Sequence, residues 1–586
     1  MKIKLSDYVI SYLKKKGIKT FFTVSGGASL HLINSVNKIK GVRYICNHHE
    51  QAAACAADGY ARAKNHLGCA IATSGPGATN LITGIASSYF DSVPVIYLTG
   101  QTSSKRSFKG SKVRQIGFQE TNIVDMVKPI TKYSVKVDDP YKIKYYLDKA
   151  VEISLTDRKG PVLLDIPDDF QFSIINTKKL IEKKISIKKQ EKKFSNFLQA
   201  KSKIENYINK SKKPVLIMGW GAVLSNTYKD ILEFSKRYNI PYCLTWAVSH
   251  LGDYKDDLYF GTFGTHGNRH SNIALEKADL LISLGTRMDT KATGSPIKNF
   301  SKNSKKIIFD IDLHELEKFK KFDLKFDLII QDNLKNFSKQ LKHLKINRFS
   351  DTWKKQVLEI KNIMKKYDEK GRNFSGLNPY KLMNYFSDLY KKKMNIICDT
   401  GCVVAWINQE FKFNKNINLF HDYNNTAMGW ALPASIGSYF FSKTKTVCFV
   451  GDGSLMFCLN ELATVQKHQI PIILFIMNNN GYSMIRQTQD QWFDSDYFAS
   501  DSSGGISFPN FQYIAKSFNI EYKKVKNLKD LDKIKNKLLN NTKPLIVDIQ
   551  IPEDASVVPQ VKYGYRNFEM EPIIPSKVMN EIMKKK

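Results

Sequence analysis

The chain has 586 residues, of which 42% are hydrophobic and 12% aromatic, so it can build roughly three folded domains. This composition excludes disordered, collagen-like and coiled-coil proteins. The formal net charge is +35, from 90 basic and 55 acidic residues. Because the excess is mostly lysine scattered along the whole chain, with no basic stripe that alternates with aromatic residues, we expect no nucleic-acid partner.

Membrane insertion and secretion are not indicated. No apolar segment reaches the ~20 residues that a membrane-spanning helix needs, and residues 471–477 have only the length of a buried strand. The first 17 residues lack the apolar core of a signal peptide and predict an amphipathic helix. The eight cysteines are scattered, and Cys398 and Cys402 are too far apart for a zinc or redox CxxC pair. We therefore expect a cytoplasmic protein with free thiols.

Short apolar runs that end in Gly, Asp or Asn recur along the chain, as at residues 93–100 and 447–453. They predict buried parallel strands, and helical patterns lie between them. Polar, Lys-rich stretches near residues 176–195 and 333–375 interrupt the alternation. We predict an α/β fold of three doubly wound domains with parallel sheets, at residues 1–175, 190–345 and 375–552, followed by a C-terminal tail at 553–586.

Two polar motifs follow neighbouring predicted strands. Gly451-Asp452-Gly453-Ser454 ends one strand, and Asn479 and Gly481 follow the next, with a crossover helix predicted at 459–468. The carboxyl ends of parallel strands meet at one edge, and carboxylate, amide and carbonyl oxygens suit Mg²⁺, which also takes phosphate oxygens. The pair GDG and NN is the signature of thiamine diphosphate (ThDP) enzymes. The alternative is an ordinary turn capped by Asp452.

A second signal is Glu50, which opens an Ala-rich predicted helix at 51–63. ThDP enzymes place a carboxyl group beside the aminopyrimidine, where it favours the tautomer that takes the proton from C2. Glu50 matches that position; the alternative is a glutamate stabilised by the helix dipole. Residues 73–80 (TSGPGATN) form a Gly/Pro turn that suits either an anion or a tight corner. The sequence contains no Walker A motif, so nucleotide hydrolysis is not indicated.

In motif order and over nearly its whole length, the chain resembles the large catalytic subunit of acetohydroxyacid (acetolactate) synthases. Residues 285–294 and 420–430 are more similar to acetolactate-synthase-like enzymes of bacterial surface-sugar pathways. The resemblance implies pyrimidine-binding, central and pyrophosphate-binding domains in that order, with ThDP, Mg²⁺ and FAD as cofactors. It also implies a homodimer or homotetramer with active sites between subunits, and leaves room for a regulatory small subunit.

The resemblance further implies roles for single residues. Catalytic residues would be Glu50, Phe118 and Gln119, although Gln119 could instead cap a turn. Mg²⁺ would be held by the side chains of Asp452 and Asn479 and the carbonyl of Gly481. The other residues implied around ThDP are Gly26, Gly27, Thr73, Pro76, Asn80, Gly401, Met428 under the bend of the cofactor, Gly451, Gly453, Ser454 and Tyr482. Those implied around FAD are Gly219, Gly221, His266, Gly285, Arg287 and Asp310.

The reaction implied is decarboxylation of pyruvate and transfer of the two-carbon unit to a second 2-ketoacid as carbonyl acceptor. Thr488 stands where the synthases carry a Trp that shapes the acceptor pocket, and Cys402 stands where they carry a polar pair. A keto-sugar nucleotide or another larger acceptor is therefore an alternative, as is simple decarboxylation of a 2-ketoacid. A catalytically silent paralogue is disfavoured because Glu50 and Asp452 are both present.

Overall fold

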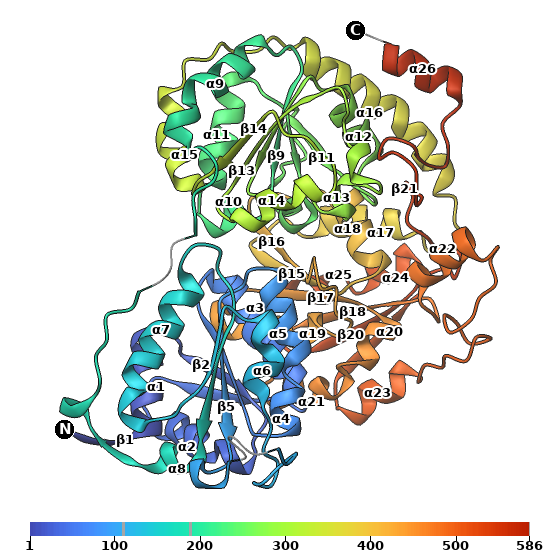
Figure 1. Cartoon of the computed structure of the whole chain (residues 1–586). Coiled ribbons are helices and arrows are strands. Elements are labelled where there is room, and N and C mark those ends of the chain that lie inside the picture. The colour runs from blue at the N-terminus through green and yellow to red at the C-terminus, as the bar shows by residue number, and fades with distance from the viewer. Residues whose placement is uncertain (108–111, 187–189, 585–586) are drawn as a thin grey trace.

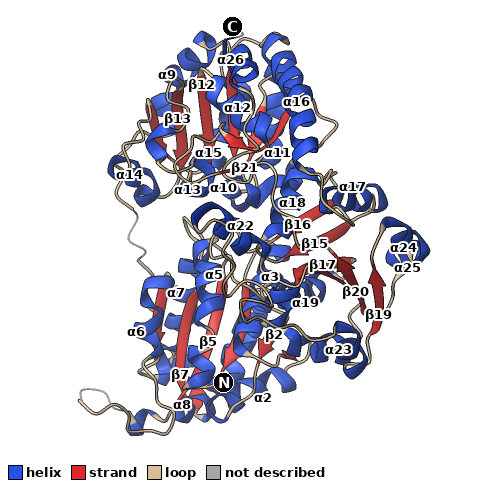
Figure 2. Cartoon of the chain, turned by 90° about the vertical axis from the view of Figure 1, so that its right-hand side faces the viewer, coloured by secondary structure: helices blue, strands red, loops and turns tan. Residues whose placement is uncertain are grey.

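The computed structural model describes residues 1–107, 112–186 and 190–584. It contains three six-stranded sheets, and every strand pairing within them is parallel. Helices cover both faces of each sheet (Figures 1 and 2). The predicted α/β fold is therefore confirmed. In Figure 1 the first sheet (blue) and the third (orange) lie below the central one (green).

The first sheet has the strand order β3-β2-β4-β5-β7-β6. Its strands are β2 Thr20–Thr23, β3 Arg43–Cys46, β4 Gly68–Ala72, β5 Val95–Gln101, β6 Tyr133–Lys136 and β7 Val162–Pro167. Its helices are α1 Leu5–Lys15, α2 Leu30–Lys38, α3 Glu50–Lys64, α4 Pro76–Thr79, α5 Ile82–Phe90, α6 Ile123–Val127, α7 Ile143–Leu155 and α8 Asp168–Phe172. A short antiparallel pair, β1 Lys2–Lys4 with β8 Ile174–Asn176, joins the two ends of this domain. The amphipathic first helix expected from the sequence is α1, which buries its apolar face.

The central sheet has the order β11-β10-β9-β12-β13-β14. Its strands are β9 Pro214–Met218, β10 Tyr242–Leu244, β11 Tyr259–Thr262, β12 Leu280–Leu284, β13 Lys305–Asp310 and β14 Leu328–Gln331. Its helices are α9 Phe197–Lys210, α10 Trp220–Leu224, α11 Tyr228–Tyr238, α12 Arg269–Lys277, α13 Thr290–Thr293, α14 Leu313–Lys321 and α15 Leu334–Gln340. The charged helix α16, Thr352–Gly371, leads to the third domain.

The third sheet has the order β16-β15-β17-β18-β20-β19. Its strands are β15 Met394–Cys398, β16 Ile417–Phe420, β17 Thr446–Gly451, β18 Ile473–Asn478, β19 Glu521–Val525 and β20 Leu545–Gln550. Its helices are α17 Pro379–Leu389, α18 Cys402–Glu410, α19 Ala431–Ser442, α20 Asp452–Met456, α21 Leu462–Lys467, α22 Ser483–Trp492, α23 Phe511–Ser517, α24 Leu528–Lys533 and α25 Lys535–Asn540.

The C-terminal segment folds back onto the central domain rather than trailing away. Strands β21 Gln560–Val561 and β22 Met570–Glu571 form an antiparallel pair, and helix α26, Ser576–Lys584, follows. Arg269 of α12 donates to the carbonyl of Met570 at 2.6 Å. The backbone N–H of Val561 donates to the carbonyl of Thr265. No helix of the described residues is long and apolar enough to cross a membrane.

The first and third domains are joined through helices α3 and α19, which cross with small residues between them. A Cβ on Gly437 would lie 1.8 Å from the carbonyl oxygen of Ala56, and one on Gly59 would lie 2.3 Å from that of Ala434. The backbones therefore approach so closely that no side chain fits between them. A single hydrophobic core, including Ala53 and Trp430, continues from one domain into the other.

Candidate active site

In each sheet the first strands in chain order extend to one side and the later strands to the other, and the change of direction falls between β2 and β4, between β9 and β12, and between β15 and β17. Ligands of doubly wound folds bind beyond the carboxyl ends of the strands at such points. The loops that leave these six strands contain most of the residues implied as cofactor contacts. One example from each loop is Gly26 and Thr73 in the first domain, Gly219 and Gly285 in the central domain, and Gly401 and Asp452 in the third.

Glu50 lies at the first of these points, buried as the first residue of α3. The ring of His49 caps the helix by accepting from the backbone N–H of Gln51 at 3.1 Å. The Asn80 amide donates to Glu50 Oε2 at 2.9 Å. Gly77, in the same turn as Asn80, leaves room for the Thr73 side chain, since a Cβ there would lie 2.7 Å from Thr73 Cγ2, and Glu50 Oε1 is the next atom at 3.4 Å. Glu50 is thus oriented by the turn that begins with Thr73.

The rest of that turn is also crowded against its neighbours. Thr73 Oγ1 accepts from the backbone N–H of Ala28 at 3.2 Å, and the Thr73 side chain fills the space above Gly26. Gln119 has a left-handed φ of 59° and packs over Gly75, so it lies beside the Glu50 turn. Phe118 is different: its side chain is 85% exposed on the surface of the chain. Within one chain, the Phe118 side chain is therefore not packed into the turn that orients Glu50.

A buried carboxylate that the sequence analysis missed anchors the loop before Glu50. Glu461 ends the short 3₁₀ helix Leu459–Glu461 and is fully buried. Its two oxygens accept from the Asn47 amide at 2.8 Å and from the backbone N–H of His48 at 2.7 Å. Burial raises the pKa of Glu461, and the donated hydrogen bonds oppose that rise. The third domain therefore holds the backbone that leads into Glu50. An acidic residue in the otherwise uncharged stretch LNELATV was the available signal.

The predicted metal motif is assembled at the third domain. Asp452 Oδ1 accepts from the N–H of Gly453 at 2.7 Å, and Oδ2 accepts from the N–H groups of Asn479 at 3.0 Å and Gly481 at 3.3 Å. Burial raises the pKa of Asp452 to about 6 against these hydrogen bonds. The Asn479 amide donates to Ser483 Oγ. The two motifs meet because β17 and β18 are paired neighbours.

The geometry of this turn fits a magnesium–diphosphate unit. Asp452 and the Asn479 side chain supply hard oxygen donors, and Gly481 can supply only its carbonyl. No group of three His, Cys, Asp or Glu side chains suited to a metal occurs in the described part of the chain. A Cβ on Gly401 or Gly451 would meet nothing within 4 Å, so both backbones border open space. Tyr482 covers Gly453.

A second carboxylate outside the sequence predictions ties the Met428 loop to the metal motif. Asp399 follows β15 and is buried. It accepts from the backbone N–H groups of Gly429 at 3.3 Å and Ala431 at 3.0 Å, and it also bonds the side chain of Ser454. Burial raises the pKa of Asp399 to about 6. Asp399 therefore fixes Met428 relative to the GDG turn.

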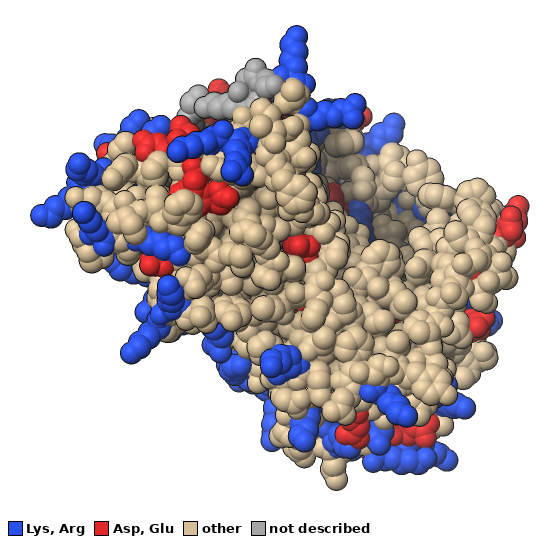
Figure 3. Space-filling model, turned by 90° about the horizontal axis from the view of Figure 1, so that it is seen from below, with Lys and Arg blue, Asp and Glu red and all other residues tan. Residues whose placement is uncertain are grey.

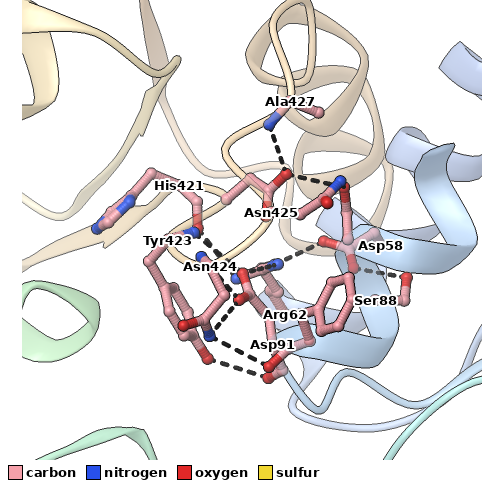
Figure 4. A network of polar contacts seen from close by, with 12 residues as sticks. Asp58, Arg62, Ser88, Asp91, His421, Tyr423, Asn424, Asn425 and Ala427 are labelled. Carbon is pink, nitrogen blue, oxygen red and sulfur yellow. Dashed lines mark hydrogen bonds and ion pairs between the residues drawn. The ribbon is translucent and has the colours of Figure 1, made fainter. Parts of the chain in front are cut away.

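The loop that precedes Met428 is anchored on the first domain by the buried network of Figure 4. Arg62 pairs with Asp58 at 2.6 Å and Asp91 at 2.7 Å, and donates to the carbonyl of His421 at 3.1 Å. Asp422 accepts from the backbone N–H of Ala427 at 2.9 Å. The stretch 420–430, which departs from the synthase pattern, is thus held by hydrogen bonds, one of them to the ion-paired Arg62.

A cavity of about 240 Å³ lies at the strand-reversal point of the central domain, and residues of the first and third domains, such as Arg158 and Tyr423, complete its lining. The N–H of Gly221 donates to the carbonyl of Gly285 at 3.0 Å, which closes the turns that border it. Buried Trp220 Nε1 and Thr286 Oγ1 have no hydrogen-bond partner and belong to residues that line it. Its lining also includes five of the six residues implied for FAD, namely Gly219, Gly221, Gly285, Arg287 and Asp310.

His266, the sixth residue implied for FAD, lies outside that lining. Its ring packs near Trp246, with 5.6 Å between ring centroids, and neither ring nitrogen has a partner. Burial, followed by the charge of Lys291, lowers the pKa of His266 to about 3, so the ring is neutral. His266 therefore lies behind the cavity wall formed by Trp246.

Comparisons with known proteins agree with this arrangement. Models of the thiamine pyrophosphate enzyme family match in order: the N-terminal TPP binding domain at residues 3–126, the central domain at 202–340 and the C-terminal TPP binding domain at 399–549. An acetolactate synthase large subunit of Cyanidium caldarium is 32% identical, covering 96% of this chain and 95% of the relative. Acetolactate synthase isozyme 1 large subunit of Escherichia coli is 30% identical, covering 96% and 97%. The chain therefore belongs to the acetolactate synthase large-subunit family of ThDP-dependent, acyloin-forming enzymes.

Proposed function

We propose that the protein is a Mg²⁺- and ThDP-dependent carboligase that decarboxylates pyruvate and transfers the two-carbon unit to a second 2-ketoacid. The observation that carries this proposal is the pair of assembled motifs: Glu50 held by Asn80, and Asp452 bonded to Asn479 and Gly481. Bound ThDP would supply the carbon nucleophile and the electron sink. The names of the relatives support pyruvate-derived acetolactate as the product.

The residues of the chain would act as follows. Glu50 would exchange a proton with the aminopyrimidine ring, and Asn80 would keep its carboxylate aimed at that ring. Asp452, Asn479 and the Gly481 carbonyl would hold Mg²⁺. Met428, fixed through Asp399, would pack under the cofactor. The remaining residues that would border the cofactor are Gly26, Gly27, Thr73, Pro76, Gly401, Gly451, Gly453, Ser454 and Tyr482. Gln119, beside the same turn, would face the substrate.

The test is incubation of the purified protein with ThDP, Mg²⁺ and pyruvate alone, with CO₂ and acetolactate quantified together. We expect one acetolactate for each CO₂ released, because a second pyruvate serves as acceptor. CO₂ with acetaldehyde and no acetolactate would identify a simple decarboxylase. Absence of any turnover with ThDP bound would contradict pyruvate as the donor.

A larger acceptor, such as a keto-sugar nucleotide, is the second candidate, and the residues of α22 favour it. Thr488 is half-buried and small where the synthases carry Trp. Its hydroxyl donates a hydrogen bond to the carbonyl of Met484 at 3.0 Å. Trp492, four residues further along the helix, is exposed in the single chain. Slow CO₂ release from pyruvate alone, accelerated by a keto-sugar nucleotide, would favour this candidate.

For the central cavity we propose FAD as the ligand, because glycine turns and unpartnered polar atoms border it. The purified protein is expected to show the visible absorbance of oxidised flavin. Gly285 has φ 62°, and a Cβ there would lie 2.8 Å from Gly221 Cα, so Gly285→Ala should remove that absorbance. ThDP binding by the same variant serves as the folding control. A colourless wild-type protein that takes up no added FAD would contradict the proposal.

The active unit is proposed to be a homodimer or a homotetramer. Large apolar side chains are exposed near the motifs of the site, among them Phe118, Phe457 and Ile485. The face shown in Figure 3 carries few charged side chains in its middle, although the net charge is +35. Light scattering is expected to give at least twice the mass of one chain. A regulatory small subunit would co-purify as a second polypeptide.

A further inference from the structure

Among the residues that the structure describes, Arg486 is a buried arginine that forms no ion pair, and the nearby carboxylate of Asp501 is partly exposed to solvent. Three arginines of the described residues are buried: Arg269 is 0%, Arg62 5% and Arg486 7% exposed. Arg62 pairs with Asp58 and Asp91, and Arg269 pairs with Asp368 at 2.7 Å. Within the described ranges, Arg486 forms no ion pair closer than 4 Å. A buried guanidinium is costly unless an anion or several acceptors compensate it.

The hydrogen bonds of Arg486 leave it incompletely satisfied. Its Nη2 donates to the carbonyl of Asn479 at 3.3 Å and to Ser483 Oγ at 3.4 Å, both long. Its Nε is buried and has no partner. Neither acceptor is charged, so these contacts explain where the guanidinium lies but do not neutralise it.

The guanidinium lies beside the place where a diphosphate would bind. A Cβ on Gly481 would be 3.3 Å from Arg486 Cζ. Burial raises the pKa of the Cys402 thiol to about 12, and the charge of Arg486 opposes that rise, which places Arg486 near the first residue of α18. Helix α18 has nine residues, and its preceding Gly401 borders open space. A helix N-terminus, a cation and a metal turn all favour an oxyanion here.

We propose that Arg486 binds an oxygen of the ThDP diphosphate, next to the turn that would hold the metal. The inference rests on the proposed Mg²⁺–ThDP site and adds a residue to it. A guanidinium next to Mg²⁺ is unfavourable unless negative charge lies between them, and a magnesium–diphosphate unit still carries net negative charge. The apolar Cys402 and Val403 supply no competing donor side chain at this position.

The test measures the Kd of ThDP in the presence of Mg²⁺ by calorimetry on cofactor-free protein. Arg486→Met keeps the length of the side chain and removes the charge; we expect ThDP to bind about tenfold or more weakly. Arg486→Lys keeps the charge and should stay within about threefold of wild type, because Lys also binds phosphate as a point charge. Lys516→Met removes an exposed cation of the same domain and should leave the Kd unchanged. Thiamine, which lacks the diphosphate, should bind all four proteins equally.

Other outcomes separate the alternatives. If Arg486→Met binds ThDP like wild type but has a raised KM for the acceptor, the anion is the acceptor carboxylate and the proposal is wrong. If both Arg486 variants lose thiamine and ThDP in equal proportion, Arg486 only braces the turn, and the proposal is also wrong. If Arg486→Met does not fold, Arg486→Gln takes its place with the same expectation. Wild-type protein that binds no ThDP at all would overturn the proposed function itself.

Discussion

Asp452→Ala is expected to abolish Mg²⁺-dependent retention of ThDP. Asp452 is the single carboxylate among the three proposed metal ligands, and it also receives the N–H groups of Asn479 and Gly481. The substitution therefore removes the negatively charged ligand of the metal. It also removes the hydrogen bonds that shape the turn. We expect the affinity for ThDP to fall by about 100-fold or more. ThDP that remains after gel filtration with Mg²⁺ is the quantity to measure.

The matched control for this experiment is Asp490→Asn, which neutralises an exposed carboxylate on α22. Its only described hydrogen-bond donors are the hydroxyls of Ser495 and Tyr497, outside the metal turn. It should retain ThDP like wild type. Equal retention by Asp452→Ala and wild type would show that the metal is held elsewhere.

Glu50→Gln is expected to slow proton removal at C2 of bound ThDP by about 10²–10⁴-fold. Glutamine has the shape of glutamate and can still accept from Asn80, but it cannot exchange a proton with the aminopyrimidine. ThDP affinity should change little. The measurement is exchange of the C2 proton for deuterium in bound cofactor, followed by NMR after an acid quench.

Gln51→Ala, at the next position of α3, provides the comparison variant, because its side chain is not placed in the proposed proton transfer. C2 exchange in that variant should match wild type. Wild-type exchange rates in Glu50→Gln would remove Glu50 from the proposed mechanism. Loss of ThDP binding in Glu50→Gln would instead point to a role in holding the cofactor.

The fold and the close approach of Asp452 to Asn479 were predictable from the sequence for one physical reason. Parallel strands buried on both faces read as continuous apolar runs, and their carboxyl ends lie at a common edge. β17 and β18 are such neighbours, so Asp452 and Asn479, 27 residues apart, come within hydrogen-bonding distance. The contact between Glu50 and Asn80 forms at the carboxyl edge of the first sheet, where these residues follow β3 and β4 on either side of β2.

The buried carboxylates could not be assigned in the same way. Glu461 bonds Asn47, 414 residues away, and Asp399 bonds backbone N–H groups about 30 residues further on. Such partners depend on how whole domains pack, which local periodicity does not report. The lack of an ion pair at Arg486 among the described residues is likewise seen only when the positions of the surrounding carboxylates in the folded chain are known. Phe118 faces solvent in one chain, so its proposed role depends on a second subunit.

The close crossing of α3 and α19 has a consequence for how the protein unfolds. The carbonyl oxygens of Ala56 and Ala434 occupy the space that a Cβ on Gly437 or Gly59 would need. If the two helices moved slightly apart, no side chain would be there to fill the space between them. We expect their amide protons to exchange with deuterium in a single cooperative event, although the helices are more than 350 residues apart in sequence. The central sheet, with separate hydrophobic cores, is free to exchange at its own rate. The first and third domains would then form one unit of stability, and neither would be expected to survive expression alone.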